Sequence, residues 1–89
     1  MKKIEIKFTP QERDLIVDHP FADLELTKAL KIAQVRGKYL IARYSIDELD
    51  DLLGFIAAVA NHTEDKQLEK KFDRLYEKLD RILTKETDR

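Results

Sequence analysis

Two stretches of sequence determine the fold class, IEIKFTPQERD at residues 4–14 and LIARYSIDELD at residues 40–50. The alternation of apolar and charged residues from Ile4 to Phe8 is typical of a half-buried strand, and the second stretch begins with a similar aliphatic and aromatic run. In both stretches a hydroxyl residue follows the aromatic residue, and a glutamate stands three positions later, which is the pattern of a capping box that opens a helix. Each stretch therefore predicts a strand that passes directly into a helix. The predicted capping residues are Thr9, Glu12, Ser45 and Glu48.

The segment between the two stretches predicts one more helix. Apolar residues at helical spacing indicate a helix from Ala22 to Ala33, and Gly37 marks a turn before the strand at Lys38–Tyr44. Because two helices separate the two strands, the strands should be antiparallel neighbours. We predict an α+β fold of order β-α-α-β-α-α, in which four helices cover a two-stranded antiparallel sheet. We expect residues 1–89 to form a single domain.

The most regular element is the C-terminal helix, predicted from Glu64 to about Lys85. Its apolar residues recur at spacings of four and three, and we expect Leu68, Leu75 and Leu79 to be buried. The short turn before this helix predicts an antiparallel hairpin with the preceding helix. The apolar stripe consists of Leu68, Phe72, Leu75, Leu79 and Ile82.

The turn between these two helices contains Asn61, His62 and Thr63. We expect Asn61 to adopt a left-handed conformation, His62 to interact with the carbonyls at the helix end, and Thr63 to cap the next helix. His62 and Asp65 could offer two metal ligands, but a tetrahedral site needs three or four. We therefore predict that the chain has no metal site.

The overall charge of the chain is almost balanced, with 17 basic and 18 acidic residues and a net charge of −1. Nucleic-acid and polybasic membrane proteins usually carry a basic surplus, so neither partner is expected. The chain has no cysteine, which excludes disulfides and zinc-thiolate sites and suits the cytoplasm. The longest apolar stretch, Phe55 to Ala60, is too short to span a bilayer.

No motif in the sequence indicates an enzyme, and we predict no catalytic residue and no cofactor. The acidic cluster at residues 47–51 matches a helix start, and the isolated Gly37 and Gly54 form no phosphate-binding loop. A small enzyme that uses carboxylates remains one alternative. A nucleic-acid accessory protein remains another, because aromatic residues lie beside basic residues in both strands. Those residues are Lys7, Phe8, Tyr39, Arg43 and Tyr44.

The C-terminal helix is the candidate recognition surface. At about 100° per residue, its acidic residues fall on one flank of the apolar stripe and its basic residues on the other. Such segregated flanks could complement a protein partner, or a second copy in a homodimer. We therefore predict a protein-interaction or regulatory module. The candidate partner-binding residues are Arg74, Tyr76, Lys78, Arg81 and Leu83.

Residues 45–58 read SIDELDDLLGFIAA and residues 60–63 read ANHT. Together with positions extending to Leu75, they resemble a small uncharacterised bacterial domain family of unknown function. The resemblance implies a domain that stands alone or extends a larger protein. It implies no activity and no functional residue.

Overall fold

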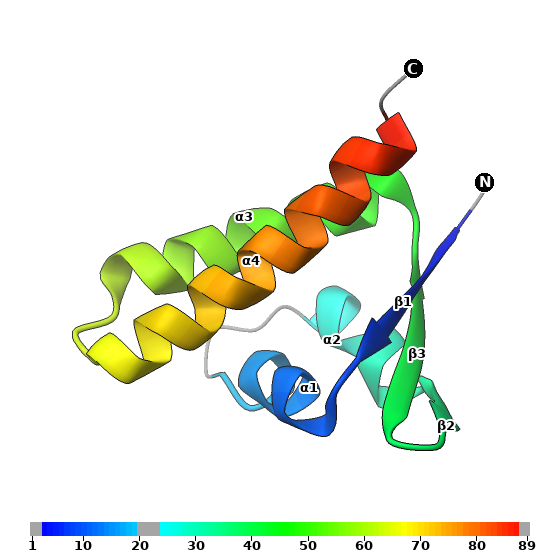
Figure 1. Cartoon of the computed structure of the whole chain (residues 1–89), viewed down its shortest axis with the longest axis horizontal. Helices are drawn as coiled ribbons and strands as arrows, with labels where there is room; N and C mark the ends of the chain where they lie inside the picture. Colours follow the sequence, from blue (N-terminus) through cyan, green and yellow to red (C-terminus); the bar gives the residue numbers. More distant parts are fainter. Residues whose placement is uncertain (1–2, 20–23, 88–89) are drawn as a thin grey trace. The chain divides into compact units, whose positions relative to one another are not determined.

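The computed structural model describes residues 3–19 and 24–87, and this described part contains three strands and four helices (Figure 1). The elements are β1 (Ile4–Phe8), α1 (Pro10–Val17), α2 (Leu24–Lys31), β2 (Gln34–Arg36), β3 (Tyr39–Tyr44), α3 (Ile46–His62) and α4 (Lys66–Thr87). Residues 22 and 23 of the predicted second helix lie outside the described residues. The chain divides into two compact units, Met1–Glu48 and Leu49–Arg89.

The first unit contains a three-stranded antiparallel sheet of order β1-β3-β2, so the predicted two-stranded sheet is wrong. The missing strand, β2, consists of three exposed residues and has a single apolar side chain, Val35, which is too short a pattern to indicate a strand. It joins β3 through Gly37 and Lys38, with Arg36 opposite Tyr39. Gly37 has a φ of 61°, as a two-residue hairpin turn requires.

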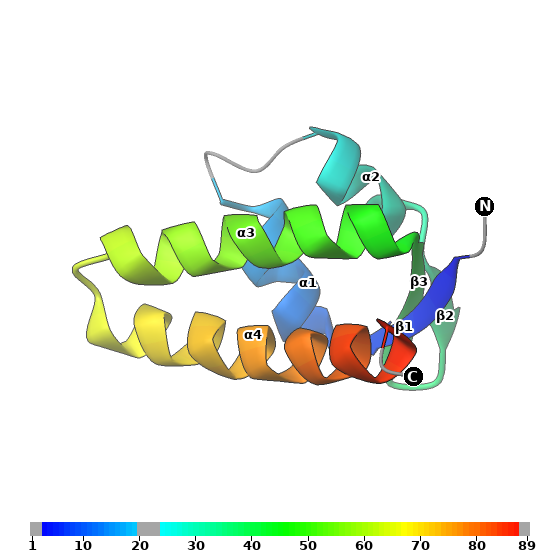
Figure 2. The same ribbon diagram turned by 90° about the horizontal axis from the view of Figure 1, so that it is seen from above.

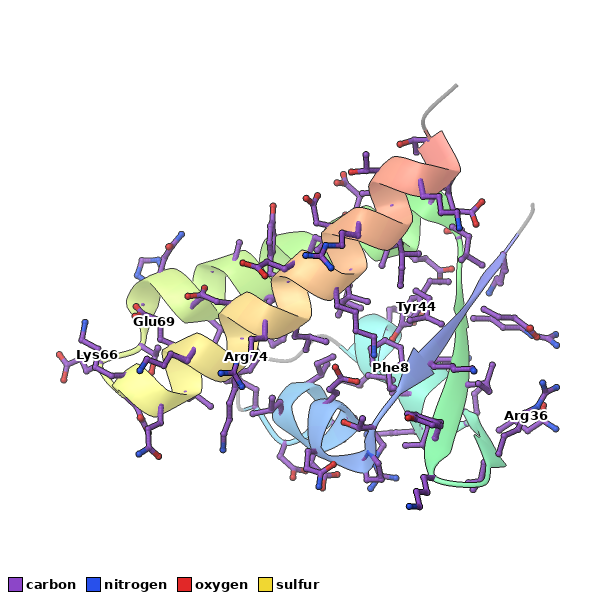
Figure 3. The ribbon with its side chains drawn as sticks, viewed as in Figure 1. Phe8, Arg36, Tyr44, Lys66, Glu69 and Arg74 are labelled. Atoms are coloured by element: carbon purple, nitrogen blue, oxygen red, sulfur yellow. The ribbon has the colours of Figure 1, made fainter. Side chains whose placement is uncertain are left out.

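The sheet has a core face and a charged outer face. Ile4 pairs with Tyr44 and Phe8 with Leu40, so these residues share the core face, while Ile41, opposite Lys7 on the other face, is also buried. The rings of Phe8 and Tyr44 meet edge to face, with centroids 6.3 Å apart. Figure 3 shows these two rings on one side of the sheet and Arg36 on the other. α1 packs against β1 and α2, and α2 packs against β3.

Both strand-to-helix junctions contain a capping box. The Thr9 hydroxyl accepts a hydrogen bond from the Glu12 N–H at 3.1 Å, and the Glu12 carboxylate accepts one from the Thr9 N–H at 2.8 Å. Ser45 and Glu48 form the same reciprocal pair, again at 3.1 and 2.8 Å. These bonds satisfy backbone donors that a helix start leaves without intrahelical partners, which fixes where α1 and α3 begin.

The second unit contains a helical hairpin, in which α3 and α4 run antiparallel side by side (Figure 2). The buried residues of α4 are Phe72, Leu75 and Leu79. Leu68 is only half-buried, contrary to expectation, because it lies in the first turn of α4. The buried residues of α3 in this unit are Leu49, Leu52, Leu53, Ile56, Val59 and Ala60.

The turn between α3 and α4 differs from the prediction. α4 begins at Lys66, so its capping residue is Asp65 and not Thr63. The Asp65 carboxylate accepts hydrogen bonds from the N–H groups of Gln67 and Leu68 at 3.0 and 3.2 Å. Thr63 lies outside the helix, and its hydroxyl accepts from the Asp65 N–H at 3.2 Å. The cap must immediately precede the first helical residue, and Thr63 is too early in the chain.

Asn61 and His62 belong to the last turn of α3. No described residue other than glycine has a positive φ, so the left-handed conformation expected for Asn61 is wrong. His62 is exposed, and its ring forms no hydrogen bond with the described residues. Any favourable effect of His62 on α3 would therefore come from a charge near the helix C-terminus.

Candidate protein-binding groove

A groove with a volume of about 430 Å³ lies between α3 and α4, and all of its lining residues belong to the second unit. Tyr76 and Leu83 are half-buried in its wall. The residues from α3 are Asp50, Asp51, Leu53, Gly54 and Ala57, and those from α4 are Tyr76, Asp80 and Leu83. The groove thus combines apolar and acidic side chains from both helices of the hairpin.

Small residues on α3 and a regular spacing on α4 create this groove. Gly54 has no side chain, and apart from its own helix backbone and chain neighbours no described atom lies within 4 Å of where its Cβ would stand. Ala57 follows one turn later on the same side of α3. On α4, Tyr76, Asp80 and Leu83 are spaced by four and three residues, which places them in a stripe beside the buried one.

The mouth of the groove is negatively charged. Asp50, Asp51 and Asp80 are exposed, and none of them forms an ion pair with a described residue. Among the described residues that line the groove there is no lysine, arginine or histidine. Uncompensated charges of one sign beside an apolar surface attract a ligand of the opposite sign.

The structure brings together only part of the predicted partner-binding set. Tyr76 and Leu83 line the groove, whereas Arg74, Lys78 and Arg81 do not. At about 100° per residue, these three basic residues fall on the other flank of α4. The predicted set therefore separates into an apolar pair inside the groove and a basic group outside it.

The contribution of α3 to this groove is not evident from the sequence. Asp50 and Asp51 follow a capping box, so they read as ordinary acidic residues of a helix start. The available signal was the pair of small residues at Gly54 and Ala57, one helical turn apart, which leave little side-chain volume on that side of α3. That signal alone does not indicate which residues of α4 lie opposite.

A second cleft, with a volume of about 650 Å³, lies in the first unit beside α2. Most of its charged groups have partners within the protein. Lys3 Nζ lies 3.7 Å from Glu48 Oε1, and Arg43 forms an ion pair with Glu5 at 2.9 Å. The residues that line this cleft are Lys3, Glu25, Lys28, Ala29, Ile32, Ala33, Gln34, Ile41, Arg43 and Glu48.

Glu48, in this cleft, has a lowered pKa. The hydrogen bond from the Ser45 backbone N–H lowers the pKa of Glu48, and the nearby charge of Lys3 lowers it further. A carboxyl with a lowered pKa is ionised at neutral pH and is poorly suited to act as a general acid. The arrangement of Glu48 is therefore that of a structural group.

Two further properties of the described residues bear on function. Across residues 3–19 and 24–87, no three His, Asp or Glu side chains are placed to hold a metal ion together. In the same ranges, no helix combines the length and the apolar character needed to cross a membrane.

No protein-family model matches the chain, and no curated protein or solved structure matches it.

Proposed function

We propose that this chain is a non-enzymatic protein-interaction module, whose groove between α3 and α4 binds a basic amphipathic helix of a partner protein. The supporting observation is that Tyr76 and Leu83 line the same groove as three carboxylates. None of these carboxylates has an ion-pair partner among the described residues. As part of the same proposal we place the protein in the cytoplasm, since a chain without cysteine needs no oxidising compartment.

The two kinds of side chain would have different roles in binding. Partly buried aromatic and aliphatic side chains such as Tyr76 and Leu83 supply most of the affinity in helix-in-groove recognition. Exposed carboxylates at the rim mainly increase the association rate and select against acidic partners. Arg74, Lys78 and Arg81 lie on the flank of α4 away from the groove. They would repel a cationic helix from that flank and so favour its binding in the groove.

The experiment is calorimetric titration with an amphipathic helical peptide built of leucine and lysine. The variant Asp50→Asn/Asp51→Asn/Asp80→Asn removes the three groove carboxylates, and we expect it to raise the dissociation constant by about tenfold or more. Leu83→Ala should also weaken binding, because it removes an apolar contact of the groove.

The matched control is Glu69→Gln/Asp73→Asn/Glu77→Gln, which changes the net charge equally through residues of α4 outside the groove. This control should bind the peptide like the parent protein. Equal weakening in both triple variants would show that only overall charge attracts the peptide, and the proposed site would be wrong. Sedimentation velocity of the protein alone supplies a second check, since self-association through α4 would mean that a second copy occupies this surface.

A further inference from the structure

The outer face of the sheet gathers basic residues around one exposed aromatic ring. The strand register places Lys7 of β1, Arg36 of β2, and Tyr39 and Arg43 of β3 on the face opposite Phe8 and Tyr44. All four of these outer-face residues are exposed. The part of this face around Tyr39 is therefore exposed, whereas Ile41, opposite Lys7 on the same face, is only 7% exposed.

Tyr39 does not follow the pattern of the other aromatic residues in the sheet. Phe8 and Tyr44 are both 0% exposed, whereas Tyr39 is 45% exposed on the central strand. The ammonium of Lys7 lies 5.7 Å from the centroid of the Tyr39 ring. A cation at that distance is attracted to the π-face of the ring, so this face is directed toward the charged side of the sheet and not toward the core.

The strand residues of this outer face carry a net positive charge, although the whole chain is almost neutral, because Lys7, Arg36 and Arg43 lie on it with Glu5. Among the strand residues of this face, Glu5 is the only carboxylate, and it binds the Arg43 guanidinium through two nitrogens at 2.9 and 3.1 Å. Arg36 contacts the amide oxygen of Gln34 at 3.4 Å and has no carboxylate partner among the described residues. Lys38, in the adjoining turn, forms no ion pair with them either.

We propose that this outer face binds single-stranded nucleic acid, with one base stacked on Tyr39 and the adjacent phosphates held by Lys7, Arg36 and Lys38. An open aromatic ring on a sheet, bordered by cations, is the arrangement that stacks unpaired bases. The incoming base would take the position of the Lys7 ammonium over the ring, and that ammonium would move to a phosphate. A base within a duplex cannot reach the ring, because both of its faces are stacked.

The test is fluorescence anisotropy with a labelled oligothymidylate at low salt. Tyr39→Ala should weaken binding by about tenfold or more, whereas Tyr39→Phe should retain it, because stacking needs the ring and not the hydroxyl. Tyr76→Ala is the matched control, since it removes a tyrosine from the groove of the other unit. Circular dichroism should show that all three variants remain folded.

The phosphate contacts are tested by the dependence of binding on salt. Arg36→Gln/Lys38→Gln should reduce the slope of log K against log salt by about 1.4, or about 0.7 for each phosphate contact to a single strand. Lys70→Gln/Lys71→Gln removes the same charge from α4 and should leave the slope unchanged. The proposal is wrong if the oligonucleotide does not bind, if Tyr39→Ala binds normally, or if a duplex of the same length binds equally well.

Discussion

Glu48 shows how one side chain can serve two elements. Its carboxylate accepts the hydrogen bond that caps α3, and it also forms an ion pair with Lys3, which immediately precedes β1. Both interactions favour the ionised form, which explains the lowered pKa of Glu48. Because 42% of the Glu48 side chain remains exposed, solvent screens this charge and its contribution to stability is small.

This arrangement predicts a loss of stability in acid. The pKa of Glu48 is lower in the folded chain than in the unfolded chain, where it is near 4.5. The stabilisation is therefore present above about pH 4.5 and is lost as the pH falls through the folded-state pKa. Glu48→Gln keeps a capping side chain but removes the charge, so its free energy of unfolding should fall less steeply with acid.

Urea unfolding at neutral pH and at several values below pH 4.5 would measure this difference. Glu77→Gln removes an exposed carboxylate from α4 and serves as the control. The explanation fails if Glu48→Gln and the parent protein lose the same amount of stability over that range.

At the scale of elements, the apolar stripe of α4 is the clearest helical pattern in the sequence, and it also supplies the buried residues of this helix. Leu75 lies in the middle of the stripe and is 1% exposed. Leu75→Ala should destabilise the protein by about 2–5 kcal/mol, because it removes buried apolar surface and leaves a cavity.

Thermal and urea unfolding would measure the effect of Leu75→Ala. Lys71→Ala, on an exposed position of the same helix, should change the free energy of unfolding by less than about 0.5 kcal/mol. A small effect of Leu75→Ala would mean that α4 contributes little to the core.

At the scale of the whole molecule, patterns within single elements could be predicted and arrangements between elements could not. Alternation and capping boxes located β1, α1 and α3, since these signals depend on neighbours in sequence. β2 could not be predicted, because its single apolar residue, Val35, forms no alternating pattern of apolar and polar residues. The groove between α3 and α4 could not be predicted either, because its lining depends on which residues of α4 lie opposite Gly54.

Net charge was equally uninformative about local surfaces. A value of −1 for the chain conceals a cationic outer face on the sheet and an acidic groove between α3 and α4. These two surfaces belong to different compact units. The substitutions proposed for one surface can therefore serve as controls for the other.

The turn at Gly37 makes the stability of the β2–β3 hairpin depend on whether residue 37 has the L or the D configuration. Its φ of 61° is unfavourable for an L-amino acid, although nothing lies within 4 Å of the position of a Cβ. L-alanine at this position should therefore destabilise the protein by about 1–2 kcal/mol through torsion alone. D-alanine, introduced by chemical synthesis, prefers positive φ and should stabilise the hairpin by about 0.4–1 kcal/mol by restricting the unfolded chain. Thermal unfolding of the two synthetic variants, which differ only in the configuration at residue 37, would measure the difference. Equal stability would show that backbone torsion at this residue does not determine the stability of the turn.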